Sequence, residues 1–292
     1  MSKQYDVAVV GATGAVGETM MSILEERDFP VRTLYPLASA RSAGKTVKFR
    51  GKSVRVTDLA EFDFSQAQIG LFSAGGSISE EFAPKAAAAG CIVIDNTSHF
   101  RRDADIPLIV PEVNLPALAG YTQRNIIANP NCSTIQMLVA LKPIYDAVGI
   151  ERINVCTYQA VSGTGKEAIE ELAGQTARLL NGQSIECEVY PKQIAFNVLP
   201  HIETRDKISA ADARKLLEGS PGITVVDERA DGGYPTAVTE SAGKDPVFVG
   251  RIREDISHPR GLDLWVVSDN VRKGAALNSV QIAEALIRGY ID

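Results

Sequence analysis

Long apolar runs, a basic net charge and paired cysteines are all absent from this sequence of 292 residues. No stretch approaches the roughly 20 apolar residues of a bilayer-spanning helix, and residues 1–6 lack the form of a signal peptide. These absences predict a cytoplasmic protein with no membrane partner. The net charge of −6 argues against a nucleic-acid partner. The four cysteines show no CxxC spacing, so neither a disulfide framework nor a metal site is indicated.

The composition is that of a globular protein, since 45% of the residues are hydrophobic and 23% are charged. At this length two domains are favoured over one. Short apolar runs alternate with helical segments in the first half, which predicts an α/β fold with a doubly wound, Rossmann-type parallel sheet. Strands are expected at 7–10, 31–37, 69–72, 91–94 and 125–128, and helices at 16–26 and 80–89.

The pattern changes after residue 132. A helix is expected over 133–148, a strand over 153–158 and a second helix after residue 166. Strands over 247–250 and 262–267 indicate a second sheet, and an amphipathic helix over 275–291 is expected to pack back on the first domain. We therefore predict a cofactor domain of residues 1–131 and 273–292, and a second α/β (α+β) domain of residues 132–272.

A glycine-rich turn follows the first predicted strand and opens the first predicted helix. Glycine lets the backbone turn tightly, and a helix N-terminus offers N–H groups and a positive dipole end to a pyrophosphate. The alternative is a turn that binds nothing. The turn residues expected to contact a dinucleotide are Gly11, Thr13, Gly14, Ala15 and Val16.

The end of the second predicted strand indicates which dinucleotide is bound. An NAD site usually has an acid there for the ribose 2′-hydroxyl, but residues 37–44 contain none. Arg41 with Ser39 and Ser42 suits a 2′-phosphate instead, because a guanidinium grips phosphate oxygens in a fork. A solvated polar loop is the alternative, and NADP(H) is the predicted cofactor.

Cys132 is the candidate nucleophile. It lies in the run Asn129-Pro130-Asn131-Cys132-Ser133-Thr134, at the predicted start of a helix whose dipole favours a thiolate. Asn131 and nearby backbone N–H groups could stabilise an oxyanion. Cys91 and Cys156 lie in apolar runs and are expected to be core residues. Cys187, in a polar stretch, indicates nothing.

Taken together, these motifs resemble the aspartate-β-semialdehyde dehydrogenase family over nearly the whole chain. Besides the glycine-rich turn and the Cys132 motif, the matching segments are 38–44, 73–76, 95–98, 100–101, 110–114, 158–163 and 268–274. The resemblance implies that NADPH reduces β-aspartyl phosphate to aspartate semialdehyde through a Cys132 thioester, in a pathway to lysine, methionine and threonine. It also implies a homodimer formed by the second domain.

The resemblance implies roles for further residues. Arg101 matches the position that binds the leaving phosphate, a suitable use of a bidentate cation. Gln159 matches a substrate-contacting residue, and Ser73 matches a position along the cofactor. The positions that match the nicotinamide site are Ser162, Gly163 and Asn270. A plain surface role is the alternative for Arg101 and Gln159.

One part of the family pattern is missing. Pro200 is followed directly by His201, where the family has several tens of residues that include its acid/base His and a substrate-carboxylate Arg. None of His99, His201 and His258 matches that histidine. The segment could be omitted from the sequence, deleted, or lost in a natural paralogue; we favour omission because the surrounding motifs are intact.

Four alternative functions fit the sequence less well. An N-acetyl-glutamyl-phosphate reductase or a glyceraldehyde-3-phosphate dehydrogenase relative would use similar chemistry, but the Asn-Cys-Ser-Thr and Ala-Ser-Ala-Arg-Ser runs fit them less well. A catalytically silent nucleotide-binding paralogue is favoured only by the missing segment. A purely structural protein does not account for Cys132 and the cofactor turn together.

Overall fold

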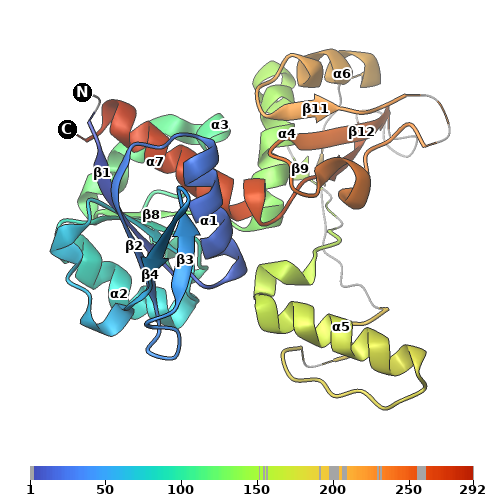
Figure 1. Ribbon diagram of the computed structural model, residues 1–292. Coiled ribbons are helices and arrows are strands. Elements are labelled where there is room, and N and C mark those ends of the chain that lie inside the picture. Colours follow the sequence, from blue (N-terminus) through green and yellow to red (C-terminus); the bar gives the residue numbers. More distant parts are fainter. Residues whose placement is uncertain are drawn as a thin grey trace. The chain divides into compact units, whose positions relative to one another are not determined.

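The computed structural model describes residues 3–291 except 151, 154, 156, 191, 197–203, 206–208, 229, 231 and 255–260. It divides into two units, residues 1–139 with 271–292 and residues 140–270 (Figure 1). Our functional division, with boundaries at 131/132 and 272/273, stays a prediction. Among the described residues no helix is both long enough and apolar enough to cross a bilayer.

The first unit is built on a parallel sheet in the order β5-β2-β1-β6-β7-β8. With the first strand central and later strands added outward on both sides, this is the doubly wound order predicted for the fold. The sheet strands are β1 Tyr5–Val10, β2 Val31–Ala38, β5 Thr57–Asp58, β6 Ile69–Phe72, β7 Ile92–Asp95 and β8 Ile126–Ala128. An antiparallel hairpin, β3 Thr46–Phe49 and β4 Lys52–Arg55, lies between β2 and β5 in sequence.

Helices cover both faces of this sheet, which explains why its central strands are mostly apolar and buried. Val7 and Val9 face a core formed with α1 Ala15–Glu26 and α7 Leu277–Gly289, whereas Ala8 and Val10 face a core formed with α2 Gly76–Ala88 (Figure 1). The expected return of the last helix to the first unit is confirmed. The remaining elements of this unit are η1 Leu59–Glu61, η2 Phe64–Gln66, η3 His99–Arg102, α3 Pro111–Asn114, η4 Leu115–Gln123 and the π-helix η7 Arg272–Ala276.

Helix α4, Cys132–Val148, runs from the first unit into the second. The second unit has a three-stranded sheet in the order β11-β12-β13, in which β12 is parallel to β11 and antiparallel to β13. Its elements are β9 Arg152–Ile153, η5 Val161–Thr164, α5 Lys166–Leu180, β10 Thr204–Arg205, α6 Ala210–Glu218, β11 Ile223–Val225, the π-helix η6 Ala237–Ser241, β12 Val247–Glu254 and β13 Leu262–Val267.

The strand predicted over 153–158 is wrong at its C-terminal end. Strand β9 ends at Ile153, and residues 157 and 158 are not in a strand, while 154 and 156 lie outside the described residues. The β-branched residues of this run favour a strand, but the partner strand of β9, β10, has only two residues. A strand extends only as far as another backbone offers hydrogen bonds.

Candidate active site

The glycine-rich turn lies where β1 and β6 end. Gly11 has φ +89°, and a Cβ at this position would lie 2.6 Å from the Ser73 carbonyl oxygen, so only glycine fits there. Gly14 donates to the Gly11 oxygen at 2.9 Å and precedes α1 as its N-cap. A Cβ on Gly17 would lie 2.2 Å from the same oxygen, so α1 packs directly against the turn.

This arrangement fits a dinucleotide pyrophosphate. This cradle is tight because only glycines at 11 and 17 avoid a clash with the Ser73 and Gly11 carbonyls, and it lies at the carboxyl ends of parallel strands, between the two halves of the sheet. Thr13, Ala15 and Val16 at the start of α1 are partly exposed and therefore within reach of a ligand. The structure also brings Ser73, predicted from the resemblance, against Gly11.

The loop that follows β2 forms a compact turn. Ser42 and Ala43 both donate backbone N–H groups to the Ser39 carbonyl, at 2.8 and 3.1 Å. Ser39 and Arg41 are exposed, whereas Ser42 is buried and its hydroxyl accepts from Lys45 Nζ at 3.5 Å. The exposed guanidinium of Arg41 lies in a loop that contains no acid. A 2′-phosphate site requires such a cation without a carboxylate that would repel the phosphate.

Cys132 is the first residue of α4 and is partly exposed. Asn131 caps this helix, since its Oδ1 accepts from the backbone N–H groups of Ser133 at 3.1 Å and Thr134 at 3.4 Å. The capping oxygen fixes the orientation of the amide, so the Asn131 NH₂ is the part available to an oxyanion. Gly274 packs on the thiol residue, because a Cβ there would lie 2.6 Å from Cys132 Cβ.

Arg101 is held beside this cysteine by main-chain oxygens. Its Nε donates to the Asn129 carbonyl at 2.9 Å and its Nη2 to the Asn96 carbonyl at 2.8 Å. Burial lowers the pKa of the Arg101 guanidinium, and the charges of Asp95 and Cys132 oppose that shift. Within the described chain no carboxylate forms an ion pair with Arg101, so its remaining N–H groups can bind a substrate anion.

A buried network of amide side chains, which the sequence analysis missed, holds the two residues that bind Arg101. Asn129 Nδ2 donates to Asn96 Oδ1 at 2.7 Å, and Asn278 Nδ2 donates to Asn129 Oδ1 at 2.6 Å. The Ser279 hydroxyl also donates to Asn96 Oδ1, at 3.0 Å. Because every amide is satisfied, the loops that carry Arg101 and Cys132 are fixed to each other and to α7.

Lys273 ends this network and is 1% exposed. Its ammonium donates to both Glu112 oxygens at 2.7 Å, to Asn278 Oδ1 at 3.1 Å and to Gln281 Oε1 at 2.7 Å. A lysine this deeply buried requires such a partner set. It lies next to Gly274 in the chain and so fixes the backbone that packs on the thiol residue.

Four predicted residues of the second unit also lie together. Ser162 Oγ and the Asn270 side-chain amide are hydrogen-bonded, with Asn270 Nδ2 donating at 3.1 Å. A Cβ on Gly163 would lie 3.3 Å from Gln159 Nε2 and 3.4 Å from Asn270 Nδ2. The structure therefore brings Gln159, Ser162, Gly163 and Asn270 into one cluster, although 108 residues separate Ser162 from Asn270.

The other cysteines and histidines are placed as follows. Cys91 is fully buried, as predicted, and desolvation raises its pKa to about 12. Cys187 is exposed. His99 is exposed in η3 with its ring against Phe100. Cys156, His201 and His258 lie outside the described residues, and among the described residues no group of three His, Cys, Asp or Glu is placed to hold a metal.

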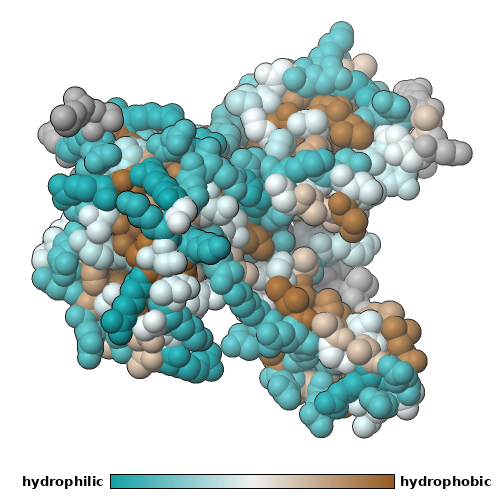
Figure 2. All heavy atoms as spheres, viewed as in Figure 1, coloured by the Kyte–Doolittle hydropathy of each residue, from teal (hydrophilic) through white to brown (hydrophobic). Residues whose placement is uncertain are grey.

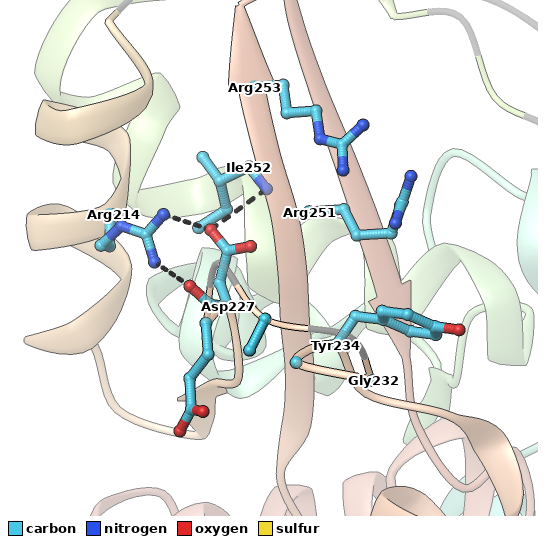
Figure 3. Close-up of a pocket in the computed structure, with 10 residues that line it drawn as sticks. Arg214, Asp227, Gly232, Tyr234, Arg251, Ile252 and Arg253 are labelled. Carbon is cyan, nitrogen blue, oxygen red and sulfur yellow. Dashed lines mark hydrogen bonds and ion pairs between the residues drawn. The ribbon is translucent and has the colours of Figure 1, made fainter.

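A hollow of about 760 Å³ in the second unit contains none of the predicted site residues (Figure 3). Arg214 forms an ion pair with Asp227 on one side of it, and Arg251 lies over the Tyr234 ring on the other. The bulge in β12, where the register shifts between Gly250 and Arg253, shapes this surface. We assign it no part in the chemistry.

Comparison with known proteins agrees with this geometry. Residues 6–121 match the family model "Semialdehyde dehydrogenase, NAD binding domain", and residues 141–209 and 201–273 match "Semialdehyde dehydrogenase, dimerisation domain". The fold and site define an oxidoreductase with a Rossmann-type nucleotide-binding domain. Within that class, the chain belongs to the aspartate-semialdehyde dehydrogenase family.

Relatives and solved structures are similar along the whole chain. The aspartate-semialdehyde dehydrogenase of Shewanella violacea is 57% identical, covering 99% of this chain and 100% of its own. That of Legionella pneumophila is 54% identical, covering 100% of this chain and 98% of its own. The crystal structure of aspartate semialdehyde dehydrogenase II from Vibrio cholerae, complexed with ASA, is 53% identical with a TM-score of 0.94, covering 99% of this chain and 100% of that one.

The alignment with the Shewanella relative includes positions that have no counterpart in this chain. The Shewanella alignment runs over 339 positions and the chain has 292 residues, so at least 47 positions (339 less 292) have no residue here. The two dimerisation-domain matches meet at 201–209, beside the junction of Pro200 and His201. That junction lies outside the described residues, so the cause of the difference stays a prediction.

Proposed function

We propose that this chain catalyses the NADPH-dependent conversion of L-aspartyl 4-phosphate to L-aspartate 4-semialdehyde and phosphate through a thioester on Cys132. The observation that supports this most directly is a partly exposed cysteine at a helix start, with a partly buried guanidinium beside it that forms no ion pair with any carboxylate among the described residues. The nucleotide cradle at Gly11 belongs to the same unit.

The residues have distinct parts in this reaction. The Cys132 thiolate attacks the acyl carbon, and the C–O bond to the phosphate breaks as the thioester forms. Arg101 stabilises the charge on the departing phosphate. The Asn131 NH₂ and backbone N–H groups near the start of α4 stabilise the oxyanion. Bound NADPH would supply the hydride that converts the thioester to the aldehyde, and the thiolate then leaves.

The binding roles of the remaining residues are part of the proposal. Gly11, Thr13, Gly14, Ala15, Val16 and Ser73 hold the pyrophosphate region, and Ser39, Arg41 and Ser42 hold the 2′-phosphate. Ser162, Gly163 and Asn270 contact the nicotinamide half, while Gln159 contacts the substrate. The proposal also includes a homodimer, a cytoplasmic location and a part in lysine, methionine and threonine synthesis. The match to the dimerisation-domain model supports the dimer.

The test is phosphate-dependent reduction of NADP⁺ by the purified chain with L-aspartate 4-semialdehyde. Turnover that Cys132→Ser abolishes supports the proposal. Faster turnover with N-acetylglutamate semialdehyde or glyceraldehyde 3-phosphate would assign the chain to one of those reactions instead. Arg101→Lys is a control that keeps the charge and removes the fork, so it should raise the phosphate KM more than it lowers kcat.

The alternative function, a nucleotide-binding paralogue with impaired catalysis, has no support among the named relatives, which are aspartate-semialdehyde dehydrogenases. A positioned general acid/base contributes on the order of 10²–10⁴ in rate, so its loss would leave NADPH binding intact and turnover very low. NADPH binding with an alkylatable Cys132 but without phosphate-dependent turnover supports this function. An intact mass near 31.3 kDa would show that no segment is missing from the sequence.

A further inference from the structure

The stretch that follows β2 is strongly basic in a protein whose net charge is −6. Residues 39–57 contain six Lys or Arg residues and no Asp or Glu. The six are Arg41, Lys45, Lys48, Arg50, Lys52 and Arg55. This stretch comprises the Arg41 loop and the β3–β4 hairpin, and Figure 2 shows hydrophilic side chains over that part of the unit.

The hairpin is hydrogen-bonded to the loop that carries Arg41. Val56 donates its N–H to the Lys45 carbonyl at 2.8 Å, and Gly44 donates to the Val56 carbonyl at 2.9 Å. The antiparallel ladder of β3 and β4 therefore continues into the loop. As a result, residues that flank the hairpin are fixed against the Arg41 loop.

Two cations contact this loop. Lys45 Nζ lies 3.5 Å from the Ser42 hydroxyl. Arg55 extends over Gly44, since its Nη2 is 3.8 Å from the point where a Gly44 Cβ would lie. Gly44 has φ +85°, and the absence of a side chain there leaves room for the guanidinium.

We propose that Lys45 and Arg55 complete, with Arg41, a three-cation site for the 2′-phosphate of NADP(H), and so help the chain to select the phosphorylated dinucleotide. The inference rests on the proposed function, which places the 2′-phosphate at this loop. A phosphate monoester carries about −1.5 to −2 charges at pH 7 and three acceptor oxygens, more than a single guanidinium satisfies.

The charged side chains around the Arg41 loop are consistent with a phosphate site there. In the part of the chain that the structure describes, neither Lys45 nor Arg55 forms an ion pair with a carboxylate. The acid that follows the basic stretch is Asp58. Its backbone lies opposite Ala38 in the sheet, and its Oδ1 accepts a hydrogen bond from the Ala60 N–H at 3.1 Å. Arg50 has another role, since its guanidinium donates to the Val31 and Phe29 carbonyls.

NADPH and NADH differ only in the 2′-phosphate, so their dissociation constants isolate its contribution. Both are measured by nicotinamide fluorescence on the full chain for Lys45→Gln, Arg55→Gln, Arg41→Gln and Lys52→Gln. Lys52 is the matched control, an exposed cation of the same hairpin that forms no side-chain hydrogen bond or ion pair with the described residues of the loop. We expect Lys45→Gln and Arg55→Gln each to weaken NADPH about threefold to tenfold, with NADH unchanged.

Each result is informative. Lys45→Arg and Arg55→Lys should retain most of the NADPH affinity, and circular dichroism confirms that each variant is folded. Equal effects on NADPH and NADH, or an effect of Lys52→Gln as large as the others, would overturn the inference. If Arg41→Gln alone weakens NADPH selectively, the inference fails while the proposed site stands. If Arg41→Gln has no selective effect, the proposed 2′-phosphate site fails as well.

Discussion

Removing the carboxylate from the buried Lys273–Glu112 pair should strongly destabilise the first unit. The Lys273 and Glu112 side chains are only 2% and 13% exposed, and Nζ lies 2.7 Å from both carboxylate oxygens. Loss of one partner of a buried pair costs about 3–5 kcal/mol because the other charge is left uncompensated. Since Asn278 and Gln281 still accept from the ammonium, we expect Glu112→Ala to cost about 3 kcal/mol, at the lower end of that range.

The assay is thermal unfolding by calorimetry. For a unit of this size, 3 kcal/mol corresponds to a fall in Tm of about 6–12 °C. The double variant Glu112→Leu with Lys273→Met removes both charges and should recover part of that loss, because the desolvation cost disappears while the amides lose a donor. A fall of less than about 2 °C for Glu112→Ala, or a double variant less stable than the single one, would refute the reasoning.

Three further predictions concern other parts of the first unit. Gly17→Ala places a methyl group 2.2 Å from a turn carbonyl, so NADPH affinity measured by fluorescence should fall at least about tenfold; unchanged affinity contradicts the cradle. At pH 8 iodoacetamide should alkylate Cys132 while leaving Cys91, whose pKa burial raises to about 12, unmodified until urea is added; peptide mass mapping distinguishes the two. The Arg32 hydrogen bond lowers the pKa of Asp6, so this pair should stabilise the fold at neutral pH by about 1 kcal/mol or less and lose that effect as pH falls below about 4. Asp6→Asn should match the wild-type Tm in acid and lie below it at pH 7, and equal differences at both pH values would contradict this.

The first unit was predicted from sequence because its signals are local. The five strands expected from the sequence are short apolar runs, and the glycines at 11, 14 and 17 and the cysteine at 132 lie at or near element ends, whereas the polar strands β3, β4 and β5 were missed. The order of strands follows from the alternation of strands and helices, since parallel strands need crossover connections. Arg101 and Ser73 were identified only through the family resemblance, because nothing in their immediate sequence distinguishes them from surface residues.

The buried network could not be predicted in the same way. Asn129 and Asn96 are 33 residues apart, Asn278 and Asn129 are 149 apart, and Lys273 and Glu112 are 161 apart. An isolated Asn or Lys in a sequence is most often exposed. Only the folded sheet, which brings the ends of β7 and β8 against α7, gives these side chains their partners. The end of strand β9 was mispredicted for the same reason, because the length of this strand depends on a partner that is distant in the sequence.

The first unit contains residues from both ends of the described chain, with α7 supplying Leu277, Val280 and Leu286 to its core. During synthesis on the ribosome, the complete second unit is therefore made before that core can close. Until then one face of the nascent sheet is covered only in part, by α1, and the remaining apolar area is a surface that a chaperone would recognise. Fragments that end before residue 277 should accordingly aggregate even though every β-strand of the nucleotide-binding sheet is present.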